Sequence, residues 1–386
     1  GTAERRLAHA LAEVGLAPAS VRVAPPATTV WLDRLPRGPA ARTVGRTARV
    51  MAREAPPEVE LFEIVLRPDR LDGSTVGVLR GDLERAASHR GSPAELWRTA
   101  RLEAVGEAAP SPPPRWSLRL TPRVEIDPAG PGGRVHKRAA ADLGVRRHDG
   151  KWLLTGVVRF NLAADLAAPD PLVGPFTIRG DVADHAALPV GLAELHSAWL
   201  WSPGKGWHLR YAGGLLEEMF GGHSAEVLLR PPGARWAVGL QADFVAKRPS
   251  HASFVGRVPL FSSMLGAYYE SAGGDAHGAL HLGRYLGGDR GATLELERRL
   301  PSGLTLRAHA TWTDATAGRG GADIGFGMAL PLGLPAAFPL DVTLEASFRR
   351  LGRDAGQRLD QPLPLYRLTG PGSYGRVAGS WRHVLE

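Results

Sequence analysis

The stretch from Tyr211 to His223, YAGGLLEEMFGGH, carries the chain's most distinctive pairing of reactive side chains, the adjacent acids Glu217 and Glu218. Glycoside hydrolases use two carboxyl groups, but those groups flank one bond from different elements, at about 5 to 10 Å. Neighbours on a strand instead point to opposite faces. We therefore interpret the segment as a turn facing the interior of the fold, whose glycines permit close approach of the backbone.

A serine and several histidines suggest nucleophilic catalysis by a Ser–His pair. Ser224 follows His223 directly, and the other histidines of nearby strands are His196, His208, His277 and His281. Such a pair needs an orienting third group and an oxyanion site, and the spacing assigns neither. His277 and His281 fall on one strand face and could bind a metal, but no acidic partner stands at ligand spacing. We expect these side chains to line an interior and predict no metal or other cofactor.

A second glycine-rich segment, Gly283 to Glu295, reads GRYLGGDRGATLE. Its glycines could suggest a phosphate-binding loop, but that mechanism needs a helix N-terminus directly after the loop, and no helix follows here. The economical interpretation is a corner between two strands.

Alternation of apolar and polar residues dominates the chain after residue 115. One apolar face comprises Trp207, Leu209, Tyr211, Gly213 and Leu215, and another comprises Trp236, Val238, Leu240, Ala242 and Phe244. The runs last about nine to twelve residues, which suits a tilted strand crossing a bilayer, whereas strands of soluble sandwiches average about five to six. The pattern predicts a mainly β fold with a transmembrane antiparallel β-barrel of about twelve to fourteen strands.

Aromatic residues near the ends of these runs support a membrane barrel, although single tryptophans also end strands of soluble sheets. They are Trp116, Trp152, Trp207, Trp236, Trp312 and Trp381.

The opposite faces of the strands carry mixed charge, which would hydrate a lumen and could contact a hydrophilic polymer. This lumen-facing set comprises Arg159, Asp243, Glu295, Glu297, Arg307, His309, Glu345 and Arg349.

The first hundred residues differ, because helical periodicity alternates there with short strands. Leu7, Leu11 and Val14 mark a helix ended by Gly15, and a second helix is predicted over 41–53. Strands are predicted over 21–23, 28–32, 60–67 and 75–80. We expect a small α+β periplasmic domain over 1–107, a proline-rich linker over 108–114 and an outer-membrane β-barrel over 115–386.

Composition excludes several classes of protein. The 386 residues include no cysteine, which rules out disulfides and cysteine nucleophiles, and no apolar run reaches the roughly 18 to 20 residues of a membrane helix. The formal net charge is +8, but arginines are interleaved with acids, so we expect no nucleic-acid partner. The chain opens with an amphipathic helix pattern and without an export signal, as in a fragment of a longer protein or a cytoplasmic protein.

Two segments carry a resemblance to a known family. YAGGLLEEMFGGHSAEVLLRPPGARWAVGLQADFVAKR and LHLGRYLGGDRGATLELERRLPSGLTLRAHATWTD resemble, in order and spacing, the YjbH family of outer-membrane proteins linked to exopolysaccharide and capsule production, which includes the GfcD proteins. The opening LAEVGLAPASVRV and the strand PPEVELFEIVL resemble the same family's middle domain. The resemblance implies an outer-membrane β-barrel lipoprotein without known catalytic activity. Members usually carry a signal peptide and another barrel-forming region upstream.

We therefore expect a non-catalytic protein that assists export or surface assembly of an exopolysaccharide or capsule, with an outer-membrane enzyme acting on lipid or glycan, or a passive porin, as alternatives. The expected partners are polysaccharide, outer-membrane lipid and periplasmic export proteins. The residues predicted to carry the family motifs and to contact glycan are Glu217, Glu218, Arg284, Tyr285, Asp289, Arg290, Glu295, Arg307 and His309.

Overall fold

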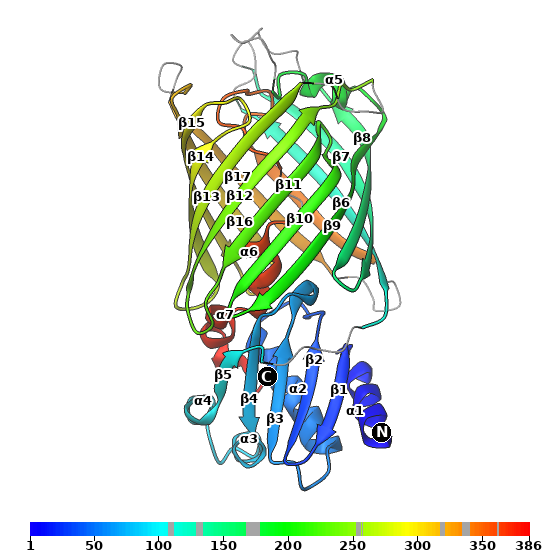
Figure 1. Cartoon of the computed structure of the whole chain (residues 1–386), viewed down its shortest axis with the longest axis vertical. Helices are drawn as coiled ribbons and strands as arrows, with labels where there is room; N and C mark the ends of the chain where they lie inside the picture. Colours follow the sequence, from blue (N-terminus) through cyan, green and yellow to red (C-terminus); the bar gives the residue numbers. More distant parts are fainter. Residues whose placement is uncertain are drawn as a thin grey trace.

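A computed structural model describes residues 1–106, 112–128, 134–166, 178–251, 256, 258–316, 321–333, 340–360 and 363–386. The expected linker over 108–114 falls partly outside these residues. The structure places a small α+β domain at one end of a tall barrel (Figure 1). Mainly β structure with a closed barrel and a small α+β sheet region confirms the predicted fold class.

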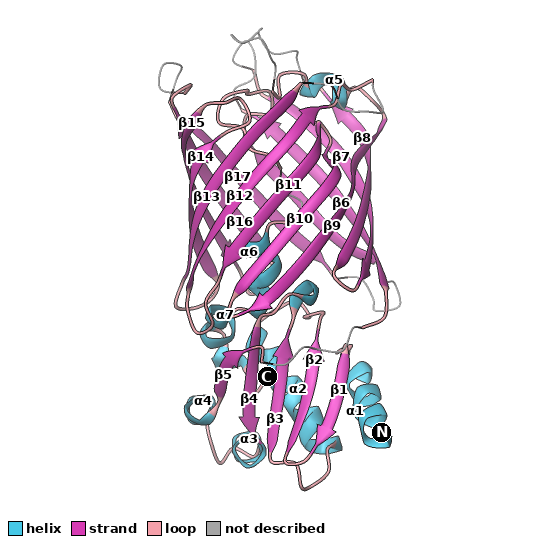
Figure 2. Cartoon of the chain, in the orientation of Figure 1, coloured by secondary structure: helices cyan, strands magenta, loops and turns pink. Residues whose placement is uncertain are grey.

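The N-terminal domain is a five-stranded sheet covered by helices (Figure 2). Its elements are α1 (Thr2–Glu13), β1 (Ser20–Ala24), β2 (Ala27–Leu32), α2 (Ala40–Glu54), β3 (Leu61–Leu66), η1 (Pro68–Arg70), β4 (Ser74–Leu79), α3 (Arg80–Ala87), α4 (Pro93–Thr99) and β5 (Arg101–Ala104). The strands lie in chain order, and the β2–β3 pair alone is parallel, because α2 connects these two strands. The predicted helices and strands of this region therefore pack as one layer of helices on one sheet.

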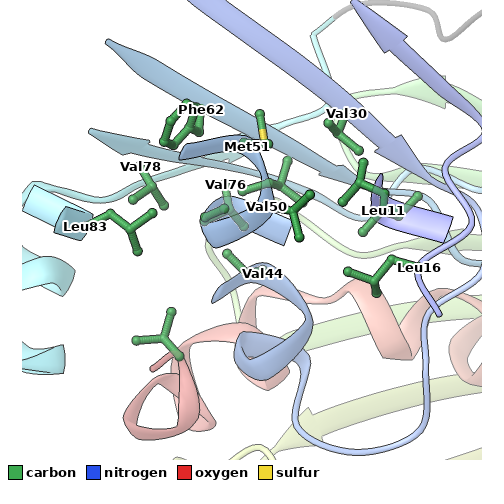
Figure 3. Close-up of a cluster of buried hydrophobic side chains, with 14 of the residues drawn as sticks. Leu11, Leu16, Val30, Val44, Val50, Met51, Phe62, Val76, Val78 and Leu83 are labelled. Atoms are coloured by element: carbon green, nitrogen blue, oxygen red, sulfur yellow. The ribbon is translucent and has the colours of Figure 1, made fainter. Parts of the chain in front are cut away.

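The core of this domain forms between the sheet and its helices (Figure 3). Leu7 and Leu11 of α1 are fully buried, as the helical spacing predicts. Phe62 and Ile64 alternate on β3 and meet Met51 of α2 in the same cluster. Burial of such side chains contributes about 1.5 to 3 kcal/mol each, relative to their exposure to water.

Among the described residues, thirteen strands close the barrel in chain order. They are β6 (Arg115–Asp127), β7 (His136–Asp149), β8 (Trp152–Ala164), β9 (Val190–Gly204), β10 (Trp207–Glu217), β11 (Phe220–Leu229), β12 (Trp236–Lys247), β13 (Pro259–Glu270), β14 (Ala276–Arg284), β15 (Arg290–Arg299), β16 (Thr305–Thr313), β17 (Asp323–Leu332) and β18 (Leu340–Phe348). Because the number is odd, β6 and β18 run in the same direction, and they close the barrel as a parallel pair, with Leu340 opposite Leu118. All other neighbouring pairs in the barrel are antiparallel.

The barrel wall has an apolar outer face and a polar inner face. On β12, Trp236, Val238, Leu240 and Phe244 are exposed, whereas Asp243 is buried. The predicted aromatic residues Trp116, Trp152, Trp207, Trp236 and Trp312 are likewise exposed. The exterior thus has the apolar character of a surface that faces lipid. No helix within the described part of the chain is long and apolar enough to span a membrane.

The chain beyond Phe348 departs from the expected barrel. Instead of ending in the wall, it turns into the lumen and runs back to the N-terminal domain through α6 (Leu365–Thr369), η3 (Gly370–Gly372), α7 (Tyr374–Gly379) and η4 (Trp381–His383) (Figure 1). We name residues 349–386 the C-terminal segment. Trp381, predicted at a membrane interface, is in fact buried in the N-terminal core with Val377 and Val384. The reason is topological, since β18 ends at the far rim and the lumen is the route back.

Candidate functional site

The C-terminal segment packs against one half of the inner wall. Its residues Leu359, Leu363 and Leu365 belong to a buried cluster with apolar side chains from β8 to β12. Tyr366 stacks on Tyr268 of β13, with ring centroids 4.1 Å apart. The apolar side chains of the segment therefore pack on the side of the lumen where the inner wall is apolar.

Carboxylates of the wall also hold the backbone of the C-terminal segment. Glu217 accepts a hydrogen bond from the Asp360 N–H at 2.6 Å, and Glu226 accepts one from the Leu365 N–H at 3.1 Å. Near the far rim, Asp127 accepts from the Leu351 N–H at 2.9 Å and Asp289 from the Gly356 N–H at 2.8 Å. Hydrogen bonds to charged groups contribute about 1.5 to 3 kcal/mol each. The segment is therefore a specifically bound part of the fold.

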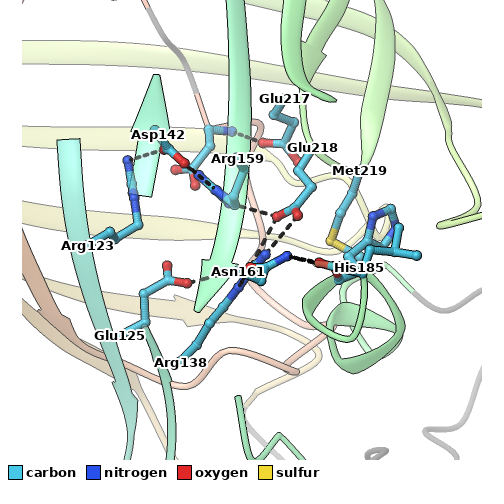
Figure 4. Close-up of polar contacts among 12 residues, drawn as sticks. Arg123, Glu125, Arg138, Asp142, Arg159, Asn161, His185, Glu217, Glu218 and Met219 are labelled. Carbon is cyan, nitrogen blue, oxygen red and sulfur yellow. Dashed lines mark hydrogen bonds and ion pairs between the residues drawn. The ribbon is translucent and has the colours of Figure 1, made fainter. Parts of the chain in front are cut away.

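An ion-pair network fills the lumen next to this contact (Figure 4). The Arg159 guanidinium donates to both oxygens of Asp142, at 2.7 and 2.8 Å, and to Glu218 at 2.7 Å. Arg138 donates to Glu218 as well, at 2.8 and 3.1 Å, and Arg123 lies 3.2 Å from Asp142. Every charge of this network has an opposite partner, as burial of charged groups requires.

In the other half of the lumen, facing β15 to β18 and β6, several charged side chains remain partly exposed. Side chains that point inward there keep substantial access to water: 35% for Arg307, 31% for Arg349 and 62% for Asp360. The arginines of this region include Arg123, Arg299, Arg307, Arg349, Arg353, Arg358 and Arg367, and its acids include Glu125, Asp127, Glu295, Glu297, Asp323, Glu345 and Asp360. This region, which we name the hydrated lumen face, carries arginines and carboxylates side by side.

The nine residues predicted to contact glycan divide into two groups. Glu217, Glu218, Tyr285, Asp289, Glu295, Arg307 and His309 are on the lumen side of the structure. Several of them are already engaged: Glu217 with Arg179, Glu295 with Arg358, and the Tyr285 hydroxyl with Thr293 at 2.6 Å. Arg284 and Arg290 instead lie exposed on the outer face. Contact with glycan stays a prediction for all nine.

The alternative catalytic residues do not converge. His223 is on the outer face, where its Nδ1 lies 2.7 Å from the Tyr211 hydroxyl, whereas Ser224 faces inward and donates to Asp243 at 2.6 Å. His277 and His281 lie 3.9 and 3.7 Å from Glu297 and Glu295. Within the residues that the structure describes, no group of three or more His, Asp or Glu side chains is arranged to hold a metal ion.

Two features escaped prediction from the sequence. The first is the C-terminal segment, whose Arg358 and Asp360 complete the lumen; the apolar residues Leu363, Leu365 and Leu368 were its available signal. The second is a hydrogen-bonded pair at the domain junction, Ser202 Oγ and His208 Nδ1, 2.8 Å apart. The cavity beside it measures about 20 Å³, room for about one water molecule and not for a substrate.

Three comparisons with known proteins bear on this arrangement. A sequence model of the family described as "YjbH: Exopolysaccharide biosynthesis protein YbjH" matches residues 1–370. "Uncharacterized lipoprotein YjbH" of Escherichia coli (strain K12) is 32% identical over 200 residues, which cover 50% of this chain and 29% of that protein. The solved structure "Salmonella typhi OmpF complex with Daunomycin" aligns with 56% of this chain and 85% of that chain, at 10% identity and a TM-score of 0.28. The matched stretch thus spans less than a third of the curated relative.

Proposed function

Because the chain belongs to the YjbH family of exopolysaccharide biosynthesis proteins, we propose that it is a non-catalytic β-barrel of the outer membrane that assists export or surface assembly of an exopolysaccharide or capsule. The observation that carries this proposal is the hydrated lumen face, which leaves charged side chains accessible inside a barrel whose exterior is apolar. A hydrophilic polymer can contact such a surface through hydrogen bonds and charge.

Two partly exposed arginines of the hydrated lumen face favour a polymer with acidic groups. Arg307 and Arg367 retain 35% and 40% of their side-chain exposure even though both lie near Glu297. Their guanidinium groups therefore have donors available beyond that carboxylate, and guanidinium pairs well with carboxylate or phosphate. The C-terminal segment narrows the lumen, which favours guided contact with one chain over the free diffusion expected of a passive porin.

The orientation of the molecule is part of the same proposal. The N-terminal domain lies at the barrel end where β6 begins and would face the periplasm, where it would meet export proteins. Exposed leucines and aromatic residues on the outer wall support a position in the membrane. The relative's name describes a lipoprotein, and attachment to a membrane would suit this orientation.

The test combines surface polysaccharide with membrane fractionation in a strain that lacks the gene. The native gene should restore surface polymer, and Arg307→Gln combined with Arg349→Gln should restore it several-fold less, at equal amounts of protein in the outer membrane. Arg298→Gln is the matched control, because Arg298 is exposed on the outer wall. Recovery of the native protein in the soluble fraction, or full restoration by the double variant, would contradict the proposal. Full restoration by His223→Ala would argue against the alternative of an enzyme that uses the adjacent His223 and Ser224.

A further inference from the structure

Arg284 and Arg290 form a pair of like charges on the outer wall. They end β14 and begin β15 at the rim farthest from the N-terminal domain, and the strand register places them directly opposite each other. Cβ atoms of opposite residues in an antiparallel pair lie about 4.5 to 5.5 Å apart, and like charges in this position are destabilising. Both side chains are exposed. A negatively charged group bound between the two arginines would relieve this repulsion.

The described part of the chain provides no ion pair to either guanidinium. The two nearby acids have other partners: Asp289 accepts from the Gly356 N–H inside the barrel, and Asp314 accepts from the backbone N–H groups of Arg290 and Ala315. This contrasts with the lumen, where Arg138 and Arg159 share Glu218. The arginine pair at the rim therefore presents its donors outward.

A groove lies in the wall beside the two arginines. This open groove of about 540 Å³ is lined by Phe261, Ser263, Gly283, Arg284, Arg290 and Gly291. A Cβ at Gly283 would lie 2.0 Å from the Ser263 carbonyl oxygen, and a Cβ at Gly291 would lie 1.9 Å from the Trp312 carbonyl oxygen. Neither position can carry a side chain without movement of the wall. These two glycines therefore let the neighbouring strands approach closely where the groove is formed.

Apolar residues begin one step further from the rim. Leu265, Leu282 and Trp312 belong to the next outward row of the register, and each is exposed by 45% or more. The arginine pair thus stands at the boundary between an apolar belt and the polar rim. In a membrane this boundary is the level of the lipid headgroups.

We propose that Arg284 and Arg290 bind the phosphate group of a membrane lipid, whose acyl chains lie along the apolar belt beside Leu265 and Leu282. A phosphate supplies the missing negative charge and accepts hydrogen bonds from both guanidinium forks. Because the ligand is amphiphilic, the apolar row and the charged pair act on the same molecule. This inference rests on the membrane position given in the proposed function.

The experiment measures binding of lipid A, with and without its phosphate groups, to the purified full-length protein in detergent by native mass spectrometry. The variants are Arg284→Gln, Arg290→Gln and the double variant. Arg147→Gln is the control, since Arg147 is an exposed outward arginine at the opposite end of the barrel. Loss of charge-assisted hydrogen bonds should weaken binding of the phosphorylated lipid by about tenfold or more in the double variant. Arg147→Gln should bind like the native protein.

Three outcomes would overturn the inference: unchanged binding by the double variant, equal binding of the lipid without phosphates, or complete displacement of the lipid by millimolar inorganic phosphate. Thermal unfolding gives an independent sign. Without lipid, each single variant should be at least as stable as the native protein, because the repulsion between the two arginines is relieved. Addition of lipid should raise the unfolding temperature of the native protein more than that of the variants. A loss of stability without lipid would instead indicate an intramolecular role. Failure of the native protein to fractionate with membranes would refute the proposed function itself.

Discussion

Gly45 in α2 touches the end of the chain through its backbone: a Cβ at this position would lie 1.6 Å from the carbonyl oxygen of Val384. The contact fixes η4 against the helix and buries Val384 and Trp381 in the N-terminal core. Residues from both ends of the chain therefore form one core, and the barrel lies between them in sequence. The C-terminal segment is bound at two places, the lumen and the N-terminal domain.

Replacement of Gly45 by alanine should release this end of the chain. The methyl group would collide with backbone atoms that cannot rotate away, so η4 must shift, at a cost of about 1 to 3 kcal/mol. Hydrogen exchange of residues 374–386 should become faster, while exchange in the barrel strands stays unchanged. The measurement is hydrogen exchange followed by mass spectrometry.

Gly81→Ala is the matched control for this experiment. Gly81 also lies in a helix, α3, but a Cβ there meets nothing within 4 Å. Alanine is the better helix former by up to about 1 kcal/mol, so this variant should be neutral or slightly stabilising. Equal protection of residues 374–386 in Gly45→Ala and the native protein would contradict the close contact.

The apolar residues of the C-terminal segment should control the width of the lumen. Leu363 and Leu365 are fully buried against the inner wall, and replacing both by serine removes the burial that holds the segment there. We expect a several-fold increase of single-channel conductance in planar lipid bilayers. Leu162→Ser, at a side chain 70% exposed on the outer belt, should leave conductance unchanged. An unaltered conductance of the double variant would show that the segment does not limit the passage.

Glu218 should be the most costly single charge to remove from the lumen network. Arg138 and Arg159 both pair with Glu218, so Glu218→Gln removes a negative charge from beside two buried guanidinium groups. This should lower the free energy of unfolding by about 3 to 5 kcal/mol. Glu345→Gln should cost less than about 1 kcal/mol, because Glu345 is 32% exposed. The check is the temperature at which each barrel unfolds in detergent. Similar unfolding temperatures of the two variants would contradict this ranking.

The sequence predicted what local patterns determine. Alternation placed Trp236 and Leu240 outside and Asp243 inside, because a strand repeats every two residues. By the same rule, Arg284 and Tyr285 lie on opposite faces. Both were predicted to contact glycan because they belong to the same sequence motif, and only the strand register shows which of them faces outward. The return of the chain through the lumen depends on an odd number of strands, which is a property of the whole barrel. Leu363 and Leu365 indicate a buried segment, but their spacing does not say that the surface they pack against is the inner wall.

Asp33 should make the N-terminal domain more stable at acidic pH. Its carboxylate is buried, with Arg70 3.6 Å and Arg67 3.9 Å away, and burial raises its pKa in spite of these two arginines. The folded state then binds the proton more tightly than the unfolded chain, whose aspartates titrate near about 3.9. Stability gained through Asp33 therefore grows as pH falls from the raised pKa toward about 4, and is lost as pH rises through the raised pKa.

Asp33→Asn isolates this dependence, because asparagine does not titrate. Arg70 also donates to the carbonyl groups of Pro113 and Gly150, so the same site connects the domain to the barrel. We expect the free energy of unfolding of the native protein, minus that of the variant, to rise between neutral pH and about pH 4 and to be constant below it. Equilibrium denaturation at several pH values measures this difference. If this difference falls with decreasing pH, the two arginines lower the pKa of Asp33 by more than burial raises it. If the difference is constant, the pKa of Asp33 is the same in the folded and unfolded states.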